Sequence, residues 1–220
     1  MKKLIIWDFD GVISDTENLW IQSRMDLLNK DLNLEWDFDT TYKNIGGMSD
    51  RDKKVKLKNL GINVKDTFWS EIINIDIQKM NNGLVITPYI EEIFKLDIFD
   101  QCIATGGVYS KTKVKLEKTG ADKYFPDDKL FTVDLVEKGK PEPDLFLLAA
   151  KKMNYEPKDC FVIEDSIVGL TAALRAKMTP IAFIKYTNPK AIEEIKKMNI
   201  PYIFDDMRDV KEFLLKNPLL

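Results

Sequence analysis

Short apolar runs, separated by polar segments of roughly helical length, set the pattern along this chain. The runs are rich in Ile, Val and Phe, and polar residues do not alternate with apolar ones inside them. That pattern is typical of strands buried on both faces. We therefore expect strands in KLIIWDF from Lys3, QCIAT from Gln101, KLFTV from Lys129, CFVIE from Cys160, PIAFI from Pro180 and YIF from Tyr202.

Segments with a helical pattern lie between these runs from Gln101 onward. Alternation of strand and helix predicts an α/β fold, in which a Rossmann-like parallel sheet carries helices on both faces. The helical segments cover approximately residues 110–119, 141–153, 166–177, 188–198 and 207–215.

The stretch from residue 15 to residue 83 breaks this alternation. It contains several helical patterns and no convincing strand, and Phe68 and Ile72 belong to a broad apolar helix face. A separate N-terminal domain would leave the first strand without partners. We therefore expect an inserted α-helical cap over residues 15–83, and an α/β core formed by residues 1–14 and 84–220.

Composition narrows the chemistry that this fold can carry. A length of 220 residues suits a core with a smaller insert. The formal charge of −3 predicts no general affinity for nucleic acid or an anionic membrane. The chain has no histidine, which excludes a histidine base, a phosphohistidine and a histidine-bound metal. Carboxylates, lysines, hydroxyls, a thiol and an oxygen-bound hard cation are left as reagents.

The cysteines and the N-terminal segment show no sign of a disulfide framework or a targeting sequence. Cys102 and Cys160 are far apart in apolar surroundings, as expected of buried thiols in a reducing compartment. The apolar run near the N-terminus ends at Asp8, which is too early for a signal peptide. No stretch approaches the ~20 apolar residues of a membrane span. We expect a cytoplasmic protein, and the sequence predicts no protein partner.

Two aspartates, Asp8 and Asp10, follow the first predicted strand in IIWDFDGVISDT. Alternate side chains of a strand share a side, so these carboxylates would point together, with Phe9 turned away. They repel one another unless a cation lies between them, and Gly11 permits a sharp exit from the strand. This pattern indicates a divalent metal site with one carboxylate free to attack, although a strand that ends in a polar turn would look similar.

Three further segments carry groups that suit a phosphate site. In CIATGG, Thr105 offers a hydroxyl and Gly106 an accessible amide before a helix, although an ordinary turn is the alternative. Lys140 precedes Pro141, which we expect at the first position of a helix. A lysine at that positive end costs about 0.3–1 kcal/mol, so an anion or carboxylate is its expected partner, unless it is a plain surface lysine.

The last of these segments is CFVIEDSIVGL. Glu164 and Asp165 end a buried strand just before a helix, where a hard cation prefers its ligands. Asp165 or Ser166 could instead serve only as a helix N-cap. All four segments lie at the carboxyl ends of predicted parallel strands, which is where open α/β sheets build ligand sites. Together they supply what phosphoryl transfer requires.

The four segments, in this order and spacing, resemble the signature motifs of the haloacid dehalogenase superfamily, in the branch of phosphoglycolate phosphatase and β-phosphoglucomutase. The resemblance implies an Mg²⁺-dependent phosphatase with Asp8 as nucleophile and Asp10 as general acid and base, its proton retained because Asp8 raises its pKa. It implies that Thr105, Gly106 and Lys140 bind the phosphoryl group. Asp8, the Asp10 carbonyl, Glu164 and Asp165 would bind Mg²⁺.

Departures from the family pattern leave alternatives open. A dehalogenase would lack the second aspartate. A phosphonate-cleaving enzyme would need a cap lysine for a Schiff base, for which Lys43, Lys53 and Lys54 are candidates by location only. A β-phosphoglucomutase-like mutase would have a histidine where this chain has Trp20, which favours transfer to water. A phosphate-sensing module of the response-regulator type would be about half as long. Lys177 stands where the family usually ends a helix with glycine, so that turn should be slightly strained.

Substrate choice is expected to reside in the predicted cap. The segment IGGMSDRDKK resembles the cap loop that reaches over the site, and Arg51 could contact a hydroxyl-rich or anionic substrate. Equally, Ser49 could be a helix N-cap with Asp52 in a capping-box spacing. The stretch YFPDDKLFTVDLVEKGKPEPD is reminiscent of bacterial sugar-phosphate phosphatases. A small phosphorylated metabolite is the expected partner, and this likeness favours a sugar phosphate.

Overall fold

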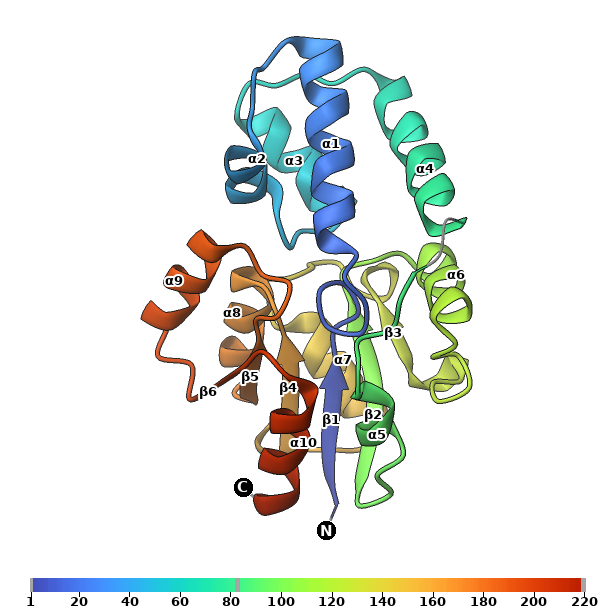
Figure 1. Cartoon of the computed structure of the whole chain (residues 1–220), viewed down its shortest axis with the longest axis vertical. Helices are drawn as coiled ribbons and strands as arrows, with labels where there is room; N and C mark the ends of the chain where they lie inside the picture. Colours follow the sequence, from blue (N-terminus) through green and yellow to red (C-terminus); the bar gives the residue numbers. More distant parts are fainter. Residues whose placement is uncertain (1, 82–83, 219–220) are drawn as a thin grey trace.

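A six-stranded parallel sheet forms the centre of the protein in the computed structural model, which describes residues 2–81 and 84–218. The strand order is β3-β2-β1-β4-β5-β6 (Figure 1). Every predicted strand is present, so the expected Rossmann-like α/β class is confirmed. The strands are β1 (Lys3–Trp7), β2 (Phe99–Thr105), β3 (Leu130–Thr132), β4 (Cys160–Glu164), β5 (Thr179–Phe183) and β6 (Tyr202–Phe204).

Strand β1 lies between β2 and β4, and the strand order reverses at this point. Ile6 is in register with Cys102 on one side and with Val162 on the other. Open α/β sheets bind ligands in the crevice at the carboxyl ends of strands beside such a reversal. The loops that follow β1, β2 and β4 therefore meet where a ligand site is expected.

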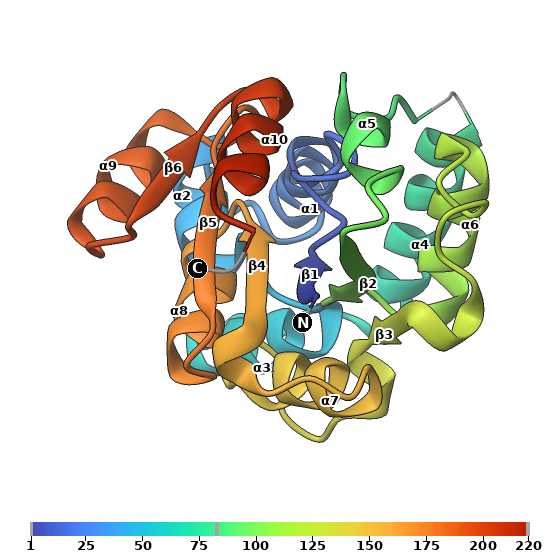
Figure 2. The ribbon, with the colours of Figure 1, turned by 90° about the horizontal axis from the view of Figure 1, so that it is seen from below.

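Helices cover both faces of the sheet (Figure 2), so the strands are mostly apolar. Ile5 and Trp7 face the cluster that includes α5 and α10, whereas Leu4 and Ile6 face α7 and α8. These helices are α5 (Ile90–Phe94), α6 (Tyr109–Thr119), α7 (Asp144–Lys152), α8 (Ile167–Arg175), α9 (Pro189–Lys197) and α10 (Met207–Lys216).

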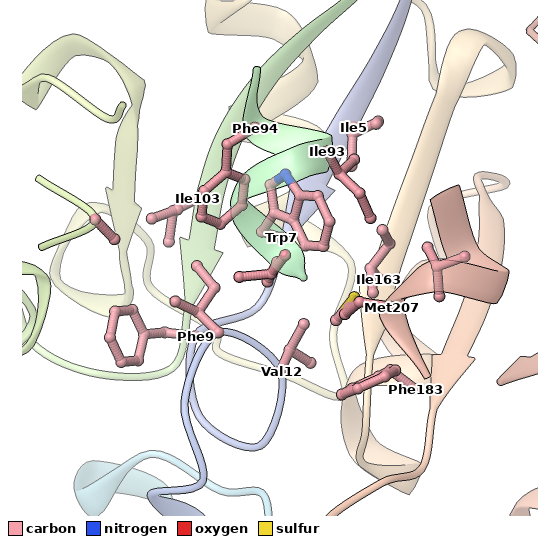
Figure 3. Packing of buried hydrophobic residues seen from close by; sticks show 14 of the residues in the cluster. Ile5, Trp7, Phe9, Val12, Ile93, Phe94, Ile103, Ile163, Phe183 and Met207 are labelled. Atoms are coloured by element: carbon pink, nitrogen blue, oxygen red, sulfur yellow. The ribbon is translucent and has the colours of Figure 1, made fainter. Parts of the chain in front are cut away.

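The first of these two clusters fixes the end of β1 that leads into the site. Trp7 packs edge-on against Phe94 with ring centroids 5.2 Å apart (Figure 3). Its indole Nε1 donates to Gln101 Oε1 at 3.0 Å, so the buried N–H is satisfied. Phe9, within the loop that follows β1, is also fully buried in this cluster. The apolar anchors on either side of Asp8 hold that residue in place.

Four helices between β1 and β2 stand over the carboxyl ends of the strands (Figure 1). We call them the cap helices: α1 (Glu17–Leu32), α2 (Phe38–Ile45), α3 (Asp50–Asn59) and α4 (Asp66–Asn81). They share a separate apolar cluster that includes Ile21, Leu28, Phe68 and Ile72. The predicted cap boundary at Gly83 lies outside the described residues. None of the described helices combines the length and apolar character that a membrane crossing requires.

Candidate active site

The loop after β1 brings Asp8 and Asp10 to the carboxyl edge of the sheet. The Asp8 amide donates to the Ile163 carbonyl at 3.0 Å, which extends the pairing with β4 by one residue. Gly11 has φ +78°, and a Cβ there would lie 2.1 Å from Asp165 Oδ2. Only glycine therefore lets this loop turn while it contacts the end of β4 so closely.

Lys140 lies between two buried carboxylates. Its Nζ is 2.6 Å from Asp8 Oδ1 and 2.7 Å from Glu164 Oε1. Burial raises the pKa of Asp8 and the Lys140 ammonium lowers it; the neighbouring carboxylates raise it again, and the balance gives a pKa of about 7. Burial works against the charged form of Lys140, but its two acidic partners outweigh burial and raise its pKa. Lys140 therefore stays charged beside Asp8.

The position of Lys140 differs from the sequence prediction. Pro141 is not the first residue of a helix: α7 begins at Asp144, and the Lys140–Pro141 peptide bond is cis. The residue before a proline is disfavoured in the α region, so Glu142 before Pro143 delays the helix. The expectation of a carboxylate partner for Lys140 agrees with the structure, whereas the reason given for it, a helix N-terminus, was wrong.

Glu164 accepts hydrogen bonds through both of its carboxylate oxygens. Its Oε1 accepts from Lys140, and its Oε2 accepts from the Asp165 amide and from the amide and hydroxyl of Ser166, at 2.8–2.9 Å. A Cβ on Gly169 would lie 1.8 Å from Glu164 Oε1, so α8 packs directly on the carboxylate. Both Glu164 oxygens therefore accept from protein donors in this arrangement, which holds Lys140 in place, and the Mg²⁺-binding role of Glu164 stays a prediction.

Asp10 is paired with a lysine that sequence analysis missed. Lys115 Nζ lies 2.8 Å and 2.6 Å from the two Asp10 carboxylate oxygens. Trp20 Nε1 donates to Asp10 Oδ1 at 2.9 Å, and the Thr16 hydroxyl donates to the same oxygen. Burial alone would raise the pKa of Asp10, but Lys115 and the other donors outweigh it and lower the pKa. The expectation that Asp8 raises this pKa was therefore wrong for this arrangement.

Thr105 and the two glycines after it bring the end of β2 into the same site. Thr105 is fully buried, and its Oγ1 accepts from the Gly107 amide at 3.2 Å. A Cβ on Gly106 would come within 3.8 Å of the Ser49 amide, so this loop faces the start of α3. The phosphate-binding residues predicted from CIATGG thus lie directly beneath the cap helices.

Oxygen ligands for a hard cation are present where β1 and β4 end. Asp8 and Asp165 line the pocket with their carboxylates, and Asp10 carries a backbone carbonyl in the same loop. Across residues 2–81 and 84–218, no three acidic or cysteine side chains already converge as a metal cage. Mg²⁺ commonly takes one or two carboxylates and completes its shell with water. Two aspartates and one carbonyl therefore fit Mg²⁺.

One small cavity of about 80 Å³ brings the predicted residues together. Arg51 is the exception, because its side chain is 45% exposed and its Nη1 donates to the Val136 carbonyl at 3.2 Å, outside the pocket. The alternative interpretation of that segment agrees with the structure, since Ser49 caps α3 and accepts from the Asp52 amide. The predicted residues that line the cavity are Asp8, Asp10, Thr105, Gly106, Lys140, Glu164 and Asp165.

Charged residues of the cap helices line the same cavity and were not predicted. Arg24, Asp50, Lys53 and Asp76 lie there with Lys111 of α6; we call these five residues the cap-side cluster. Lys111 and Lys115 are one helical turn apart on α6, and that i, i+4 spacing was the one sequence signal that could have indicated them. The others come from helices that meet only in the folded chain.

Known proteins resemble this chain over most of its length. The sequence profile of the haloacid dehalogenase-like hydrolases matches residues 5–183. A CBBY-like protein of Arabidopsis thaliana is 27% identical over 238 residues, which cover 94% of this chain and 70% of that protein. The phosphorylated carbohydrates phosphatase of Thermotoga maritima is 25% identical over 178 residues, which cover 78% of this chain and 80% of that protein. The 6-phosphogluconate phosphatase of Escherichia coli is 32% identical over 91 residues, 41% of each.

Solved structures show the same fold. A haloacid dehalogenase-like protein of unknown function from Agrobacterium tumefaciens superposes with a TM-score of 0.82 at 22% identity, over 98% of this chain and 99% of that one. A putative β-phosphoglucomutase from Thermotoga maritima gives a TM-score of 0.71 at 22% identity, over 99% of this chain and 100% of that one. With the profile match across residues 5–183, the family expected from the four motifs is confirmed: the chain belongs to the haloacid dehalogenase-like hydrolases.

Proposed function

We propose that this hydrolase is an Mg²⁺-dependent phosphatase that cleaves a small sugar phosphate through an aspartyl-phosphate on Asp8. The observation that carries the proposal is the position of the Asp8 carboxylate, held 2.6 Å from Lys140 in a pocket that also contains Asp10 and Thr105. A nucleophile, a second carboxylate for proton transfer and a fixed cation are the parts that phosphoryl transfer through a carboxylate requires.

The proposed reaction has two displacements at phosphorus. An Asp8 oxygen bonds to phosphorus while the ester P–O bond breaks, and the leaving oxygen takes a proton from Asp10. Asp10, now ionised, then removes a proton from a water molecule, which attacks phosphorus and releases Asp8 and inorganic phosphate. Lys140, the Thr105 hydroxyl and the Gly106 amide are proposed to hold the phosphoryl oxygens, where fixed donors stabilise developing charge.

The contact between Lys115 and Asp10 bears on the first proton transfer. With Lys115 in place Asp10 has a lowered pKa and is ionised, which is the form required to activate water. The acid form requires Asp10 to exchange these donors for substrate. Mg²⁺, held by Asp8, Asp165 and the Asp10 carbonyl, would supply positive charge that offsets repulsion between Asp8 and the phosphate.

Several relatives support a phosphorylated carbohydrate as substrate. Proteins that match this chain include the phosphorylated carbohydrates phosphatase, the 6-phosphogluconate phosphatase and the fructose-1-phosphate phosphatase YqaB. The second candidate is a phosphosugar mutase, since one structural neighbour is a putative β-phosphoglucomutase. Trp20 favours transfer to water, because an indole at the place of the mutase histidine donates to Asp10 but cannot accept a proton as a base.

The test is phosphate release from a panel of sugar phosphates, with Mg²⁺ or with EDTA, by the wild-type protein and by Asp8→Asn. We expect release that requires Mg²⁺ and falls by at least about 10⁴-fold in the variant. Exposed Asp122→Asn is the matched control and should keep full activity. Stable phosphorylation of Asp8 without phosphate release would contradict the phosphatase and favour a mutase or a phosphate-sensing module.

A further inference from the structure

Two of the three cations in the cap-side cluster, Arg24 and Lys111, hydrogen-bond to both of its carboxylates, whereas the third, Lys53, is only in ion-pair range of Asp50. Arg24 makes a bidentate contact with Asp76 at 2.7 and 2.9 Å and reaches Asp50 at 3.0 Å. Lys111 Nζ lies 3.1 Å from each of the same two acids. Each acid therefore already has two cationic partners, and the cluster is held together by charge-assisted hydrogen bonds between helices.

Lys53 is the one cation of the cap-side cluster that makes no hydrogen bond to its carboxylates. It is 4% exposed, and its Nζ is 3.8 Å from Asp50 Oδ1, which is too long for a hydrogen bond. Among the described residues its ammonium has no hydrogen-bond acceptor, although it carries three N–H donors and lines the pocket. The ammonium is not among the buried atoms that lack a partner and is open to the pocket, so an acceptor from outside the protein chain can reach its N–H donors.

The charges of the cluster favour an anionic acceptor. Three cations (Arg24, Lys53 and Lys111) face two carboxylates (Asp50 and Asp76), which leaves one positive charge. Arg24 Nε is also buried without a partner in the described part of the chain. A neutral hydroxyl could accept a hydrogen bond from Lys53, but it would leave the charge uncompensated. An anionic group satisfies both requirements.

The cluster lies close to the proposed reaction centre. Lys111 and Lys115 are four residues apart on α6, about 6 Å along the helix axis. Lys115 contacts Asp10, and Lys111 belongs to the cluster, so a short substrate can reach both parts of the one cavity.

We propose that Lys53, with Lys111 beside it, binds a second anionic group of the substrate, either a carboxylate or a second phosphoryl group. The proposal rests on the proposed function, since it assigns the far end of the ester that Asp8 would attack. The substrate class is then a phosphorylated sugar acid or a sugar bisphosphate, rather than a sugar phosphate with a neutral tail.

The experiment uses three open-chain esters of the same length: glucitol 6-phosphate with a neutral end, 6-phosphogluconate with a carboxylate, and glucitol 1,6-bisphosphate with a second phosphate. For the wild-type protein we expect kcat/KM to be about 10- to 100-fold higher for one or both doubly anionic esters than for glucitol 6-phosphate. The better of the two identifies the anion.

Lys53→Met is the test variant, and Lys54→Met is its matched control on the exposed side of α3. Lys53→Met should reduce the preference for the doubly anionic ester about 10-fold or more, whereas Lys54→Met should keep it. Lys53→Arg restores the charge and should recover part of the preference. Equal losses for all three esters in Lys53→Met would mean a structural role and would overturn the subsite.

Binding of the three esters to Asp8→Asn with Mg²⁺, measured by calorimetry, separates the two proposals because it requires no turnover. A 10-fold or greater preference for a doubly anionic ester there supports the subsite even if no ester is hydrolysed, in which case only the phosphatase proposal fails. Phosphate release with Asp8 and Mg²⁺ dependence, but with equal binding of all three esters, supports the phosphatase and overturns the subsite.

Discussion

The two walls of the pocket carry opposite charge. On the sheet side, four carboxylates (Asp8, Asp10, Glu164 and Asp165) face the ammonium groups of Lys115 and Lys140; we call these six residues the strand-end cluster. On the other side, the cap-side cluster has more cations than carboxylates. The strand-end cluster therefore has an excess of negative charge that a divalent cation would neutralise, and the cap-side cluster has an excess of positive charge that an anion would neutralise.

The two clusters also differ in how they are supported. Glu164 is held by backbone amides that directly follow β4, and Asp8 continues the pairing of β1 with β4. In the cap-side cluster, most of the support comes from side chains of separate helices, such as Arg24 with Asp76. A change in the strand-end cluster should therefore affect chemistry first, and a change in the cap-side cluster should affect cap stability and substrate choice.

The largest effect should follow Lys140→Met. This change leaves Asp8 and Glu164 as buried carboxylates without their common cation, which typically costs about 3–5 kcal/mol of unfolding free energy. We also expect turnover to fall by at least about 10³-fold, measured as phosphate release. Lys138→Met, exposed in the same loop, is the control. Unfolding of Lys140→Met at the wild-type urea midpoint would contradict the assigned role.

The next effect should follow Asp10→Asn, which keeps the shape of the side chain but removes its proton-transfer chemistry. We expect kcat to fall by about 10²–10⁴-fold, while circular dichroism shows an intact fold. Lys115→Met should alter the pH profile of kcat as well, since Lys115 lowers the pKa of Asp10. Near-wild-type turnover in Asp10→Asn would exclude Asp10 as the proton donor.

On the cap side, Arg24→Met should destabilise the protein by about 3 kcal/mol, because Asp76 loses its bidentate partner in a buried position. Urea unfolding measures the effect. The double variant Arg24→Met/Asp76→Asn removes the unpaired charge and should recover part of the loss. If the double variant loses as much as both single variants combined, the pair is not coupled.

Metal dependence should vary with pH at the strand-end cluster. The pKa of Asp8 is raised to about 7 in the metal-free protein, so the folded state retains a proton there that the unfolded chain releases near its ordinary value. Metal-free stability should therefore decrease as pH rises toward 7. Mg²⁺ requires the ionised form, so its affinity should fall up to about tenfold per pH unit below 7. Thermal unfolding with EDTA or Mg²⁺ at pH 5, 6 and 8 tests both, and Asp8→Asn should remove the difference.

The smallest effect is expected away from both clusters, at Lys177. This residue follows α8 with φ +58°, the strain predicted from its place in a glycine position. Lys177→Gly should stabilise the protein by about 0.5–1 kcal/mol without a change in substrate preference. A changed substrate preference in Lys177→Gly would show that this position is coupled to the pocket.

The four carboxylates of the strand-end cluster were predictable because they lie at the ends of apolar strands or within three residues after them. Asp8 and Asp165 could be found in this way, since parallel strands end at one edge of the sheet. Lys115 lies ten residues beyond Thr105, and no local pattern joins it to Asp10. In the cap, the sequence analysis predicted Arg51 as a substrate contact, whereas its neighbour Asp50 lines the pocket. Two successive residues of a helix point about 100° apart, so they cannot both face the pocket. Only the tertiary packing decides which of the two faces inward.

Ion pairs between side chains join the cap helices to the core. Lys111 of α6 holds Asp50 and Asp76, Arg51 reaches Val136, and Lys190 of α9 pairs with Asp39. These contacts join several parts of the cap to the core, so any movement of the cap helices away from the core must break some of them. Most are ion pairs, which dissolved salt weakens. A rise in ionic strength should therefore favour separation of the cap helices from the core.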